Sequence, residues 1–214
     1  MIDKEWLEYF VEKSIWNEVP NIEELYKQAT VFPLADNIFR AFNECSLDDI
    51  SVVILGQDPY PNVYKEIPSA CGLCFATENG YINPSLRIIF KELNNSYYKC
   101  TKGEDLCKWS SQGVLMLNTT LTVEQGKPNS HIKLWDKFTK ELIKNISKDK
   151  PDLVWLLMGN NAQEHIKNIK EGYIIKVPHP MADIYSGKNK FVGSNCFVEV
   201  NEILNNLNKS SIIW

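Results

Sequence analysis

The stretch VVILGQDPYP, residues 52–61, decides the fold of this chain. Its branched apolar residues predict a buried strand, because a short apolar run ended by a glycine is typical of strands in parallel sheets. A loop with an amide, a carboxylate and a Pro-Tyr-Pro turn follows at the carboxyl end of that strand. Open parallel sheets bind ligands beyond the carboxyl ends of their strands. Asp58, held in this loop by flanking prolines, is therefore a candidate catalytic group.

Apolar runs and helical patterns alternate along the rest of the chain. Strands are expected over residues 52–55, 113–117, 153–158 and 173–177. Helices are expected over residues 3–16, 22–29, 33–42, 84–93, 104–111, 131–146, 159–169 and 194–208, with a loop over residues 94–103. The alternation predicts an α/β fold with a central, mainly parallel four-stranded sheet flanked by helices on both faces. At this length, we expect residues 1–214 to form a single domain.

The helical patterns also predict which side chains face the core. Val11 lies on the apolar face of the first helix, Leu34 on that of the third, and Leu134 on that of the helix over residues 131–146. Asn83 is expected to cap the helix that Pro84 begins, because its side chain can accept from N–H groups that the first turn leaves unpaired.

Composition and charge limit the class of protein. The 214 residues are 44% hydrophobic and 23% charged, which is ordinary for a soluble globular protein. No apolar run reaches the roughly 20 residues that span a bilayer, and the N-terminus MIDKEWLEYF lacks the layout of a signal peptide. We therefore expect a cytoplasmic protein with no membrane partner. The net charge of -4 argues against non-specific coating of DNA, but a local basic patch is compatible with DNA binding.

The six cysteines are expected to be free thiols, as is usual in a cytosolic protein. Cys71 and Cys74 form a lone CxxC, and a metal or iron–sulfur site would need two more ligands at a compatible spacing. Cys100 and Cys107 fit no standard spacing with them. No metal site is predicted.

Polar side chains follow each of the four expected strands. Gln57 and Asp58 follow the first, Asn118 the second, Asn160 the third and His179 the fourth. The carboxyl ends of parallel strands meet at one edge of a sheet, so these groups form an acid/base and hydrogen-bonding set. Taken singly, each is also explained as a turn residue. Their shared position favours an α/β enzyme with an Asp–Asn–His pocket.

Six segments of the chain resemble, in order, the motifs of the family-1 uracil-DNA glycosylases. The similarity extends from about residue 33 to residue 197. The segments are GQDPYP at 56–61, GLCFA at 72–76, NPSL at 83–86, LMLN at 115–118, NSH with a later tryptophan at 129–135, and HP at 179–180. Six segments at similar spacing are a specific signal, whereas HP alone would carry almost none.

The resemblance implies hydrolysis of the bond between uracil and deoxyribose in DNA, without a metal or cofactor. The nucleotide must leave the base stack before that bond can be reached. By this resemblance, Asp58 would position the attacking water and stabilise positive charge on the sugar. His179 would donate a hydrogen bond to the departing uracil anion. Stabilisation of charge that develops in the transition state is usually the largest catalytic contribution.

The same resemblance assigns the walls of a base pocket. Asn118 would read the uracil edge with its amide, which both donates and accepts. Phe75 would stack on the flipped ring, and Tyr60 would fill the space that the methyl group of thymine needs. Gln57 would complete the pocket wall. Core packing is the alternative for Phe75, and packing between prolines is the alternative for Tyr60.

Two segments depart from the family pattern. Pro61 replaces the histidine that usually ends the first loop, and proline brings neither a side-chain donor nor an N–H. The last loop lacks the second serine-proline and the leucine that wedges into the duplex as the base leaves. Met181 or Ile184 would replace that wedge, and the sequence does not decide between them. Asp183 in this loop would repel phosphates.

Residues near these loops are candidates for gripping DNA. The predicted DNA-binding set is Pro61, Ser85, Asn160, Met181, Ile184 and Ser186. The serine hydroxyls and the asparagine amide can bond phosphates without net charge. Lys188 and Lys190 follow the last loop and would add a local positive field, and solvated surface lysines are the alternative.

Three functions fit the sequence. The first, which we favour, is an active uracil-DNA glycosylase of base-excision repair that acts on uracil-containing DNA of a nucleoid or a host cell. The second, motivated by the altered loops, is a catalytically weak member that serves mainly as a DNA- or replication-partner-binding module. The third is an enzyme with a changed choice of base. We expect a monomer, with a proteinaceous inhibitor or a replication protein as a further partner.

Overall fold

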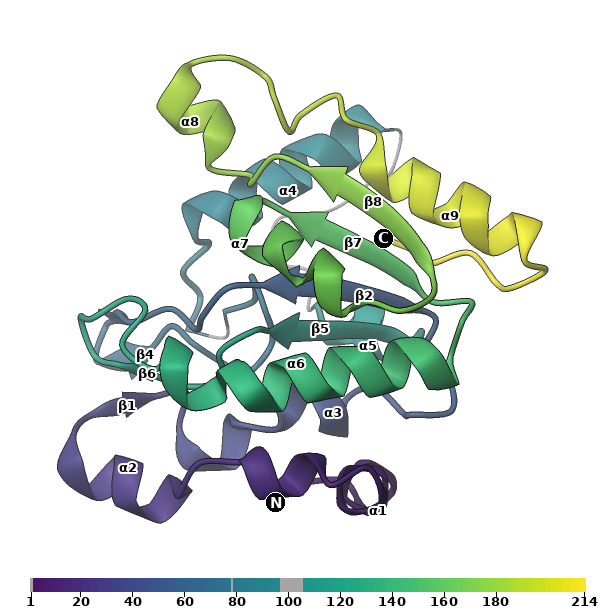
Figure 1. Cartoon of the computed structure of the whole chain (residues 1–214). Coiled ribbons are helices and arrows are strands. Elements are labelled where there is room, and N and C mark those ends of the chain that lie inside the picture. The colour runs from purple at the N-terminus through teal and green to yellow at the C-terminus, as the bar shows by residue number, and fades with distance from the viewer. Residues whose placement is uncertain (1, 78, 97–105) are drawn as a thin grey trace.

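The structure is a computed structural model that describes residues 2–77, 79–96 and 106–214. Its centre is a parallel sheet in the strand order β5-β2-β7-β8 (Figure 1). These strands are β2 (Val52–Gly56), β5 (Val114–Asn118), β7 (Val154–Met158) and β8 (Tyr173–Val177). The predicted four-stranded parallel sheet with helices on both faces is confirmed.

Helices and short strand pairs surround this sheet. The α-helices are α1 (Lys4–Glu12), α2 (Ile22–Gln28), α3 (Arg40–Asn43), α4 (Pro84–Asn95), α5 (Cys107–Ser110), α6 (Ile132–Asp149), α7 (Asn160–Gln163), α8 (Ala182–Ser186) and α9 (Cys196–Asn206). The 3-10 helices are η1 (Ile15–Glu18), η2 (Ala35–Asn37) and η3 (Glu164–Asn168). The antiparallel pairs are β1 (Val31–Phe32) with β6 (Val123–Glu124), and β3 (Val63–Tyr64) with β4 (Ile67–Pro68).

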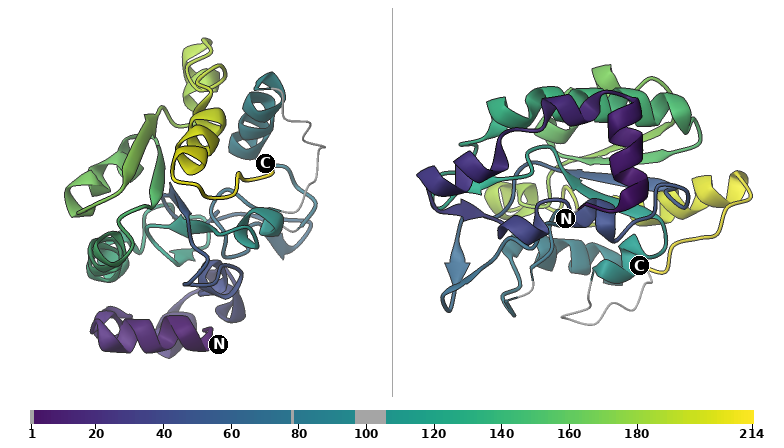
Figure 2. Two further views of the ribbon diagram at one scale, coloured as in Figure 1. Left: turned by 90° about the vertical axis from the view of Figure 1, so that its right-hand side faces the viewer. Right: turned by 90° about the horizontal axis from the view of Figure 1, so that it is seen from below.

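The helices form a layer on each face of the sheet (Figure 2). α6 and α7 lie on one face, and α4 and α9 lie on the other. The N-terminal helices α1 and α2 lie beyond the β5 edge, where η1 contacts α6. As predicted, the side chain of Asn83 caps α4 by accepting the N–H of Ser85 at 3.0 Å.

The core explains the continuous apolar runs of the sequence. β2, β5 and β7 are buried at every residue, because helices cover both faces of a parallel sheet. Aromatic rings join α1 and α3 to α6: the Phe10 ring lies edge-on to those of Phe42 and Phe138, at 5.1 and 5.4 Å between centroids. Edge-to-face packing of this kind is favourable for aromatic pairs.

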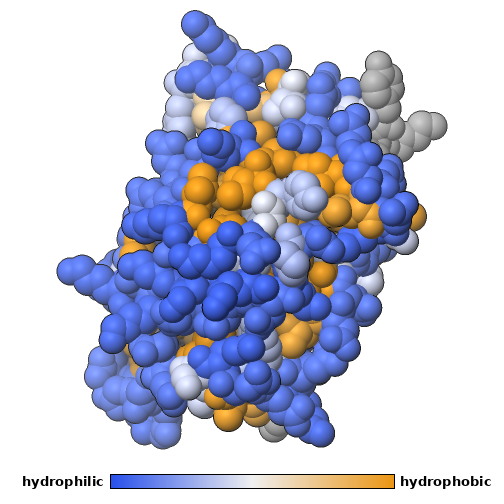
Figure 3. Space-filling view, turned by 45° about the vertical axis from the view of Figure 1, so that its right-hand side comes forward, coloured by the Kyte–Doolittle hydropathy of each residue, from blue (hydrophilic) through white to orange (hydrophobic). Residues whose placement is uncertain are grey.

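Hydrophilic residues cover most of the molecular face that Figure 3 shows, and apolar residues gather in a patch across its middle. Some apolar surface of this kind is ordinary for a folded protein. No helix in the described part of the chain is long and apolar enough to cross a membrane.

The helix predicted over residues 33–42 does not begin at Pro33. Val31 and Phe32 form β1 instead, and Leu34 has an extended backbone and is 57% exposed. Phe32 precedes Pro33, and a residue before proline favours an extended backbone. The pairing with Val123 of β6 holds Phe32 in that conformation. Helical turns therefore begin only with η2 and α3.

Contrary to the prediction, two other side chains do not face the core. Val11 is 60% exposed and Leu134 is 43% exposed. Each follows or precedes a fully buried aromatic residue, Phe10 in α1 and Trp135 in α6. Neighbours along a helix point about 100° apart, so the buried stripe of each helix is narrower than the apolar pattern suggests.

Short elements interrupt the segments that were expected to be loops. The pairs β1–β6 and β3–β4 and the helix α8 were not predicted, because two to five residues give no clear periodicity. The expected loop over residues 94–103 lies largely outside the described residues, as do Cys100 and the beginning of the helix expected over 104–111.

Candidate active site

The carboxyl ends of β2 and β7 lie side by side where the order of the strands reverses, since β5 lies on one side of β2 and β7 and β8 on the other. Open parallel sheets bind ligands in the crevice at such a point. A cavity of about 360 Å³ lies there, within the size range of small-molecule sites. The predicted site residues in its walls are Gln57, Asp58, Tyr60, Pro61, Phe75, Ser85, Asn118 and His179.

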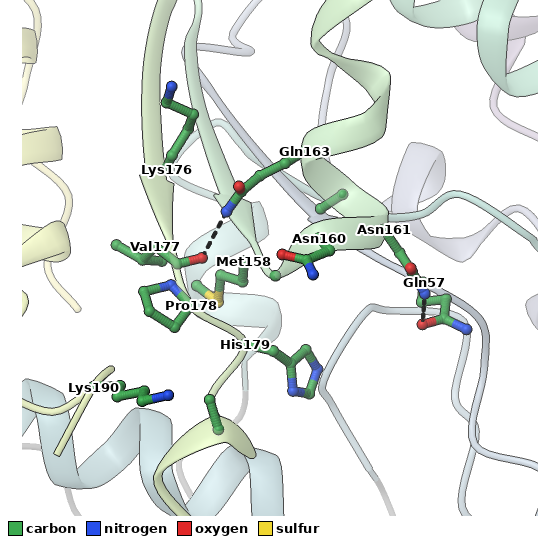
Figure 4. A pocket seen from close by; sticks show the side chains of 13 residues that line it. Gln57, Met158, Asn160, Asn161, Gln163, Lys176, Val177, Pro178, His179 and Lys190 are labelled. Atoms are coloured by element: carbon green, nitrogen blue, oxygen red, sulfur yellow. Dashed lines mark hydrogen bonds between the residues drawn. The ribbon is translucent and has the colours of Figure 1, made fainter. Parts of the chain in front are cut away.

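The remaining predicted residues lie elsewhere. Asn160 lines an adjoining cavity of about 660 Å³, and His179 lies in the walls of both cavities (Figure 4). Met181, Ile184 and Ser186 line neither of the two. The structure thus gathers the expected catalytic and base-binding groups into one cavity, together with Pro61 and Ser85 of the expected DNA-binding set.

The carboxylate of Asp58 is held by the backbone of another loop. Its Oδ2 accepts the N–H of Asn129 at 2.9 Å. Burial raises the pKa of Asp58 above its ordinary value of 3.8, and the bonds from Asn129 and Gln57 oppose that rise. A raised pKa makes Asp58 a stronger base than a solvated aspartate, which suits a group that takes a proton from water.

Asn129 is a site residue that the sequence analysis does not assign. Its side-chain oxygen accepts from the amide of Gln57, whose own oxygen accepts from the amide of Asn161 (Figure 4). Asn129 has a φ of 67°, a left-handed conformation that asparagine adopts more readily than most residues. The sequence signal that could have identified Asn129 was its position at the start of the NSH segment.

The loop after β2 is bonded to the segment after β5. The N–H of Thr119 donates to the carbonyl of Gly56 at 3.1 Å. The N–H of Thr120 and the hydroxyl of Thr119 both donate to the carbonyl of Gln57, each at 2.9 Å. Pairing between the two strands therefore continues beyond their ends and fixes the backbone that carries Asp58.

His131, the histidine of the NSH segment, belongs to a buried chain of hydrogen bonds. Its Nδ1 lies 2.9 Å from the hydroxyl of Thr122, which accepts the indole N–H of Trp135 at 2.7 Å. Since the hydroxyl oxygen accepts from the indole, its own proton is available to the imidazole. Burial lowers the pKa of His131. This chain anchors the loop that contains Asn129 on α6.

The position of Asn118 depends on the absence of a side chain at Gly56. The two residues are partners in the parallel register of β2 and β5. A Cβ atom at residue 56 would lie 2.5 Å from Oδ1 of Asn118 and 2.7 Å from Cβ of Cys74. Glycine thus leaves the space that the largely buried amide of Asn118 occupies.

His179 also lies against a glycine. A Cβ atom at Gly159, whose φ is 91°, would lie 2.7 Å from Cβ of His179. Nδ1 of His179 accepts the N–H of Met181 at 3.2 Å, so the proton of the neutral ring is on Nε2. Burial lowers the pKa of His179 below its ordinary value of 6.5, which favours that neutral form. His179 is therefore a neutral hydrogen-bond donor through Nε2.

Phe75 and Tyr60 form an aromatic wall of the cavity. The hydroxyl of Tyr60 donates to the carbonyl of Phe75 at 3.1 Å, and the rings of Phe75 and His179 lie 6.0 Å apart. Phe75 has a φ of 63°, a conformation that costs a side-chain-bearing residue about 1–3 kcal/mol. The neighbouring N–H of Cys74 donates to the carbonyl of Met116 at 3.1 Å, which holds the strained segment on β5.

The adjoining cavity has a cationic wall (Figure 4). Lys176 and Lys190 line it with the amides of Asn160, Asn161 and Gln163, and its described lining residues include no carboxylate. In a chain of net charge -4, this wall is a local positive patch that attracts anions. The position of Lys190 fits the positive field expected from it.

Cys71 and Cys74 are both buried. Burial raises the pKa of Cys74, so its thiol stays protonated and is a poor metal ligand. In the parts of the chain that the structure describes, no group of three or more His, Cys, Asp or Glu residues could hold a metal ion.

A parallel sheet with an acid/base pocket and a cationic cavity at its switch point defines this protein as an α/β enzyme whose pocket suits a flat polar ring beside an anionic chain. The family model described as the uracil DNA glycosylase superfamily matches residues 42–205. The chain belongs to this superfamily.

Individual relatives support the same conclusion. A uracil-DNA glycosylase of Aliarcobacter butzleri is 43% identical over 201 residues, covering 90% of each chain. One of Mycoplasmopsis pulmonis is 37% identical over 216 residues, covering 99% of this chain and 94% of that protein. A crystal structure of mimivirus uracil-DNA glycosylase is 26% identical, with a TM-score of 0.86, and covers 100% of this chain and 87% of that one.

The close approach at Gly56 predicts the effect of adding one methyl group. We expect Gly56→Ala to lower the free energy of unfolding by about 1–3 kcal/mol, as overpacking does, and to weaken uracil binding by displacing Asn118. Urea denaturation and uracil titration measure the two effects. In the double variant with Asn118→Ala, the destabilisation should fall below the sum of the single losses, because the Oδ1 clash is absent. Additive losses would contradict this account.

Proposed function

We propose that this protein hydrolyses the N-glycosidic bond of deoxyuridine in DNA with Asp58 and His179 as its catalytic residues. The observation that carries the proposal is the shared cavity of Asp58, Asn118 and His179, three polar groups from three different strand ends. Uracil leaves as an anion, water adds its hydroxide to the sugar, and the remaining proton balances the charge of the base. An abasic site in the DNA strand is the other product.

Asp58 acts on the sugar side of the bond. Its negative charge stabilises the positive charge that develops on deoxyribose, and the carboxylate orients the attacking water. Oδ2 is bonded to the N–H of Asn129, which supports a fixed orientation of the carboxylate. A carboxylate that holds the water in line with the sugar makes the attack effectively unimolecular, which lowers its entropic barrier.

His179 acts on the base side of the bond. Its Nε2–H donates to a carbonyl oxygen of uracil, where negative charge accumulates as the bond breaks. A neutral donor suits this task because it stabilises the anion without transferring its proton. The bond from Met181 to Nδ1 and the burial of the ring both support that protonation state.

The base pocket accounts for the choice of uracil. The amide of Asn118 offers one donor and one acceptor to the polar edge of the ring, while Phe75 provides a face for stacking. Tyr60 closes the space beside the position where thymine carries its methyl group. Its hydroxyl is bonded to the carbonyl of Phe75, which supports a rigid closure.

DNA is gripped around the pocket by polar and cationic groups. Asn160, Lys176 and Lys190 line the cavity beside His179, where the phosphates next to the extruded nucleotide would lie. Ser85 and Pro61 line the base pocket. Since two lysines carry most of the local charge, we expect affinity for DNA to be modest and to decrease with salt.

The alternative of a catalytically weak binding module is not favoured, because the groups that break the bond are together in one cavity. We propose a monomer that acts in the cytoplasm on DNA of the nucleoid or of a host cell. A variant of mimivirus UNG was solved in complex with UGI and has a TM-score of 0.90 to this chain. That likeness supports a protein partner for this chain as well.

Release of free uracil from single- and double-stranded uracil-containing DNA tests the proposed function. We expect Asp58→Asn to lower kcat by about 10²–10⁴-fold and His179→Ala by about 10²–10³-fold. Asp48→Asn, a change in an exposed aspartate that precedes the amino end of β2 and lines neither cavity, is the matched control and should leave kcat unchanged. No release by the wild type, or undiminished release by both variants, would refute the proposal.

The pKa shifts predict the pH dependence of the reaction. Asp58 must be ionised, and its raised pKa means that activity is lost, as the pH falls, at a higher pH than for an ordinary aspartate. Burial lowers the pKa of His179, so its ring is mainly neutral already at pH 6.5, the ordinary pKa of a histidine. We expect kcat/KM to be constant above about pH 7, with an acid limb that persists in His179→Gln and disappears from the residual activity of Asp58→Asn. The reverse pattern would assign the limb to His179.

Tyr60 predicts the exclusion of thymine. In Tyr60→Ala the methyl group of thymine finds space, so we expect the ratio of thymine to uracil release to rise by about 10-fold or more. Tyr60→Phe keeps the ring and should keep the exclusion, although it loses the bond to the carbonyl of Phe75. Base release from matched uracil and thymine oligonucleotides measures both. A wild type that already releases thymine would point to the changed base choice instead.

A further inference from the structure

Gln57 lies in the walls of both cavities, and its side-chain amide is bonded at both ends. The amide oxygen accepts an N–H of the Asn161 side chain (Figure 4), and the amide nitrogen donates to the side-chain oxygen of Asn129. The backbone N–H of Asn129 in turn donates to Oδ2 of Asp58 at 2.9 Å. A continuous chain of hydrogen bonds therefore connects the cationic cavity to the carboxylate.

Asp58 fixes the direction of this chain. Burial raises the pKa of Asp58, and the bonds that its carboxylate receives from the backbone of Asn129 and from the side chain of Gln57 oppose that rise. An ionised carboxylate only accepts, so the amide nitrogen of Gln57 must face Asp58 and Asn129. The amide oxygen then faces Asn161, which has to donate. Every bond of the chain is thus donated in the direction of Asp58.

The chain begins on an anchored helix. Asn161 belongs to α7, which follows β7 after the turn at Gly159. The side chain of Gln163 in the same helix donates to the carbonyl of Val177 at 2.9 Å (Figure 4), and its backbone N–H donates to the carbonyl of Gly159 at 3.1 Å. These bonds tie α7 to the carboxyl ends of β7 and β8. The backbone that carries Asn161 is therefore held by the sheet.

The other end of the chain is anchored separately. The buried hydrogen bonds of His131 hold the loop of Asn129 on α6. Because Asn129 and Asn161 belong to different elements, loss of either side chain leaves the Gln57 amide bonded at one end only. The amide is then free to rotate about the last bond of its side chain and to leave the carboxylate of Asp58.

We propose that Asn161 is a positioning residue for Asp58, and that it acts by holding the amide of Gln57 against the carboxylate. This inference deepens the proposed function and rests on it, since Asp58 orients the water there. Asn161 lines the cationic cavity and not the base pocket, so it acts on the reaction through Gln57. Hydrogen bonds that follow one another in one direction polarise and strengthen each other, which favours a fixed carboxylate.

Titration of Asp58, followed by carbon-13 NMR of its carboxyl carbon, tests this role without requiring turnover. Hydrogen bonds donated to a carboxylate favour its ionised form. Asn161→Ala loosens the donor that Gln57 provides, so we expect the pKa of Asp58 to rise above its wild-type value. Gln57→Ala should raise it as well, and Asn161→Ala added to that variant should raise it no further.

Uracil release from single-stranded DNA gives the second measurement. We expect Asn161→Ala to lower kcat about 3- to 10-fold, the effect of one hydrogen bond, and to move the acid limb of kcat/KM to higher pH. Asn160→Ala removes a neighbouring amide from the same cavity, so it should raise KM and leave the acid limb in place. Asn206→Ala, a change in an exposed asparagine of α9 that lines neither cavity, is the control and should behave as the wild type.

The NMR signal assigns the titration to Asp58 itself. The other titratable side chains in the walls of the two cavities are those of His179, Tyr60, Tyr185, Lys176 and Lys190. Among these residue types, only histidine ordinarily titrates between pH 5 and 8. A carboxyl carbon and an imidazole give separate signals, so a shift in the pKa of His179 would not be taken for one in Asp58.

Four results would overturn the inference. An unchanged pKa of Asp58 in Asn161→Ala is the first, and a rise in KM alone, which would make Asn161 a contact for DNA only, is the second. An equal movement of the acid limb in Asn160→Ala would assign the effect to the field of the cavity. Additive pKa shifts in the double variant would show that Asn161 does not act through Gln57. If the wild type releases no uracil, the proposed function fails, and the titration still decides whether Asn161 holds Asp58.

Discussion

β2 and β5 pair in a parallel register that brings Gly56 opposite Asn118, and the rest of the pocket depends on this pairing. The register continues beyond the strand ends through the bonds from Thr119 and Thr120. The same register therefore fixes the positions of both the Asn118 amide and the loop that carries Asp58. A shift of β2 by one residue would bring a side chain into the space of the amide and would exchange the side chains that β2 presents to the two helix layers.

Burial and hydrogen bonding give the two catalytic candidates different chemical characters. Burial makes Asp58 more basic, and a backbone N–H holds it without neutralising it. The same burial keeps His179 neutral, and the N–H of Met181 selects the tautomer that donates toward the cavity. Amides lie near both groups, since the side chain of Gln57 donates to that of Asn129 and accepts from that of Asn161. Fixed dipoles of this kind orient charge without adding net charge to the pocket.

The sheet and the base pocket were predictable from sequence because both depend on patterns that short segments carry. Continuous apolar runs fixed the strands, and polar residues at their ends fixed the candidates from Gln57 to His179. The role of Asn129 was missed because its backbone N–H, which any residue has, makes the bond to Asp58. Leu34 and Leu134 were misassigned because tertiary pairing and a narrow buried stripe overrode the local pattern.

The cavity takes its walls from segments that are far apart along the chain, from the Asp58 loop to His179 after β8. A growing polypeptide that has been made only as far as β7 already contains Asp58 and Asn118, but not His179. The N-terminal part of a protein is made first. The newly made chain therefore has the complete cavity only late in its synthesis, when β8 has joined the sheet and brought His179 to the cavity wall.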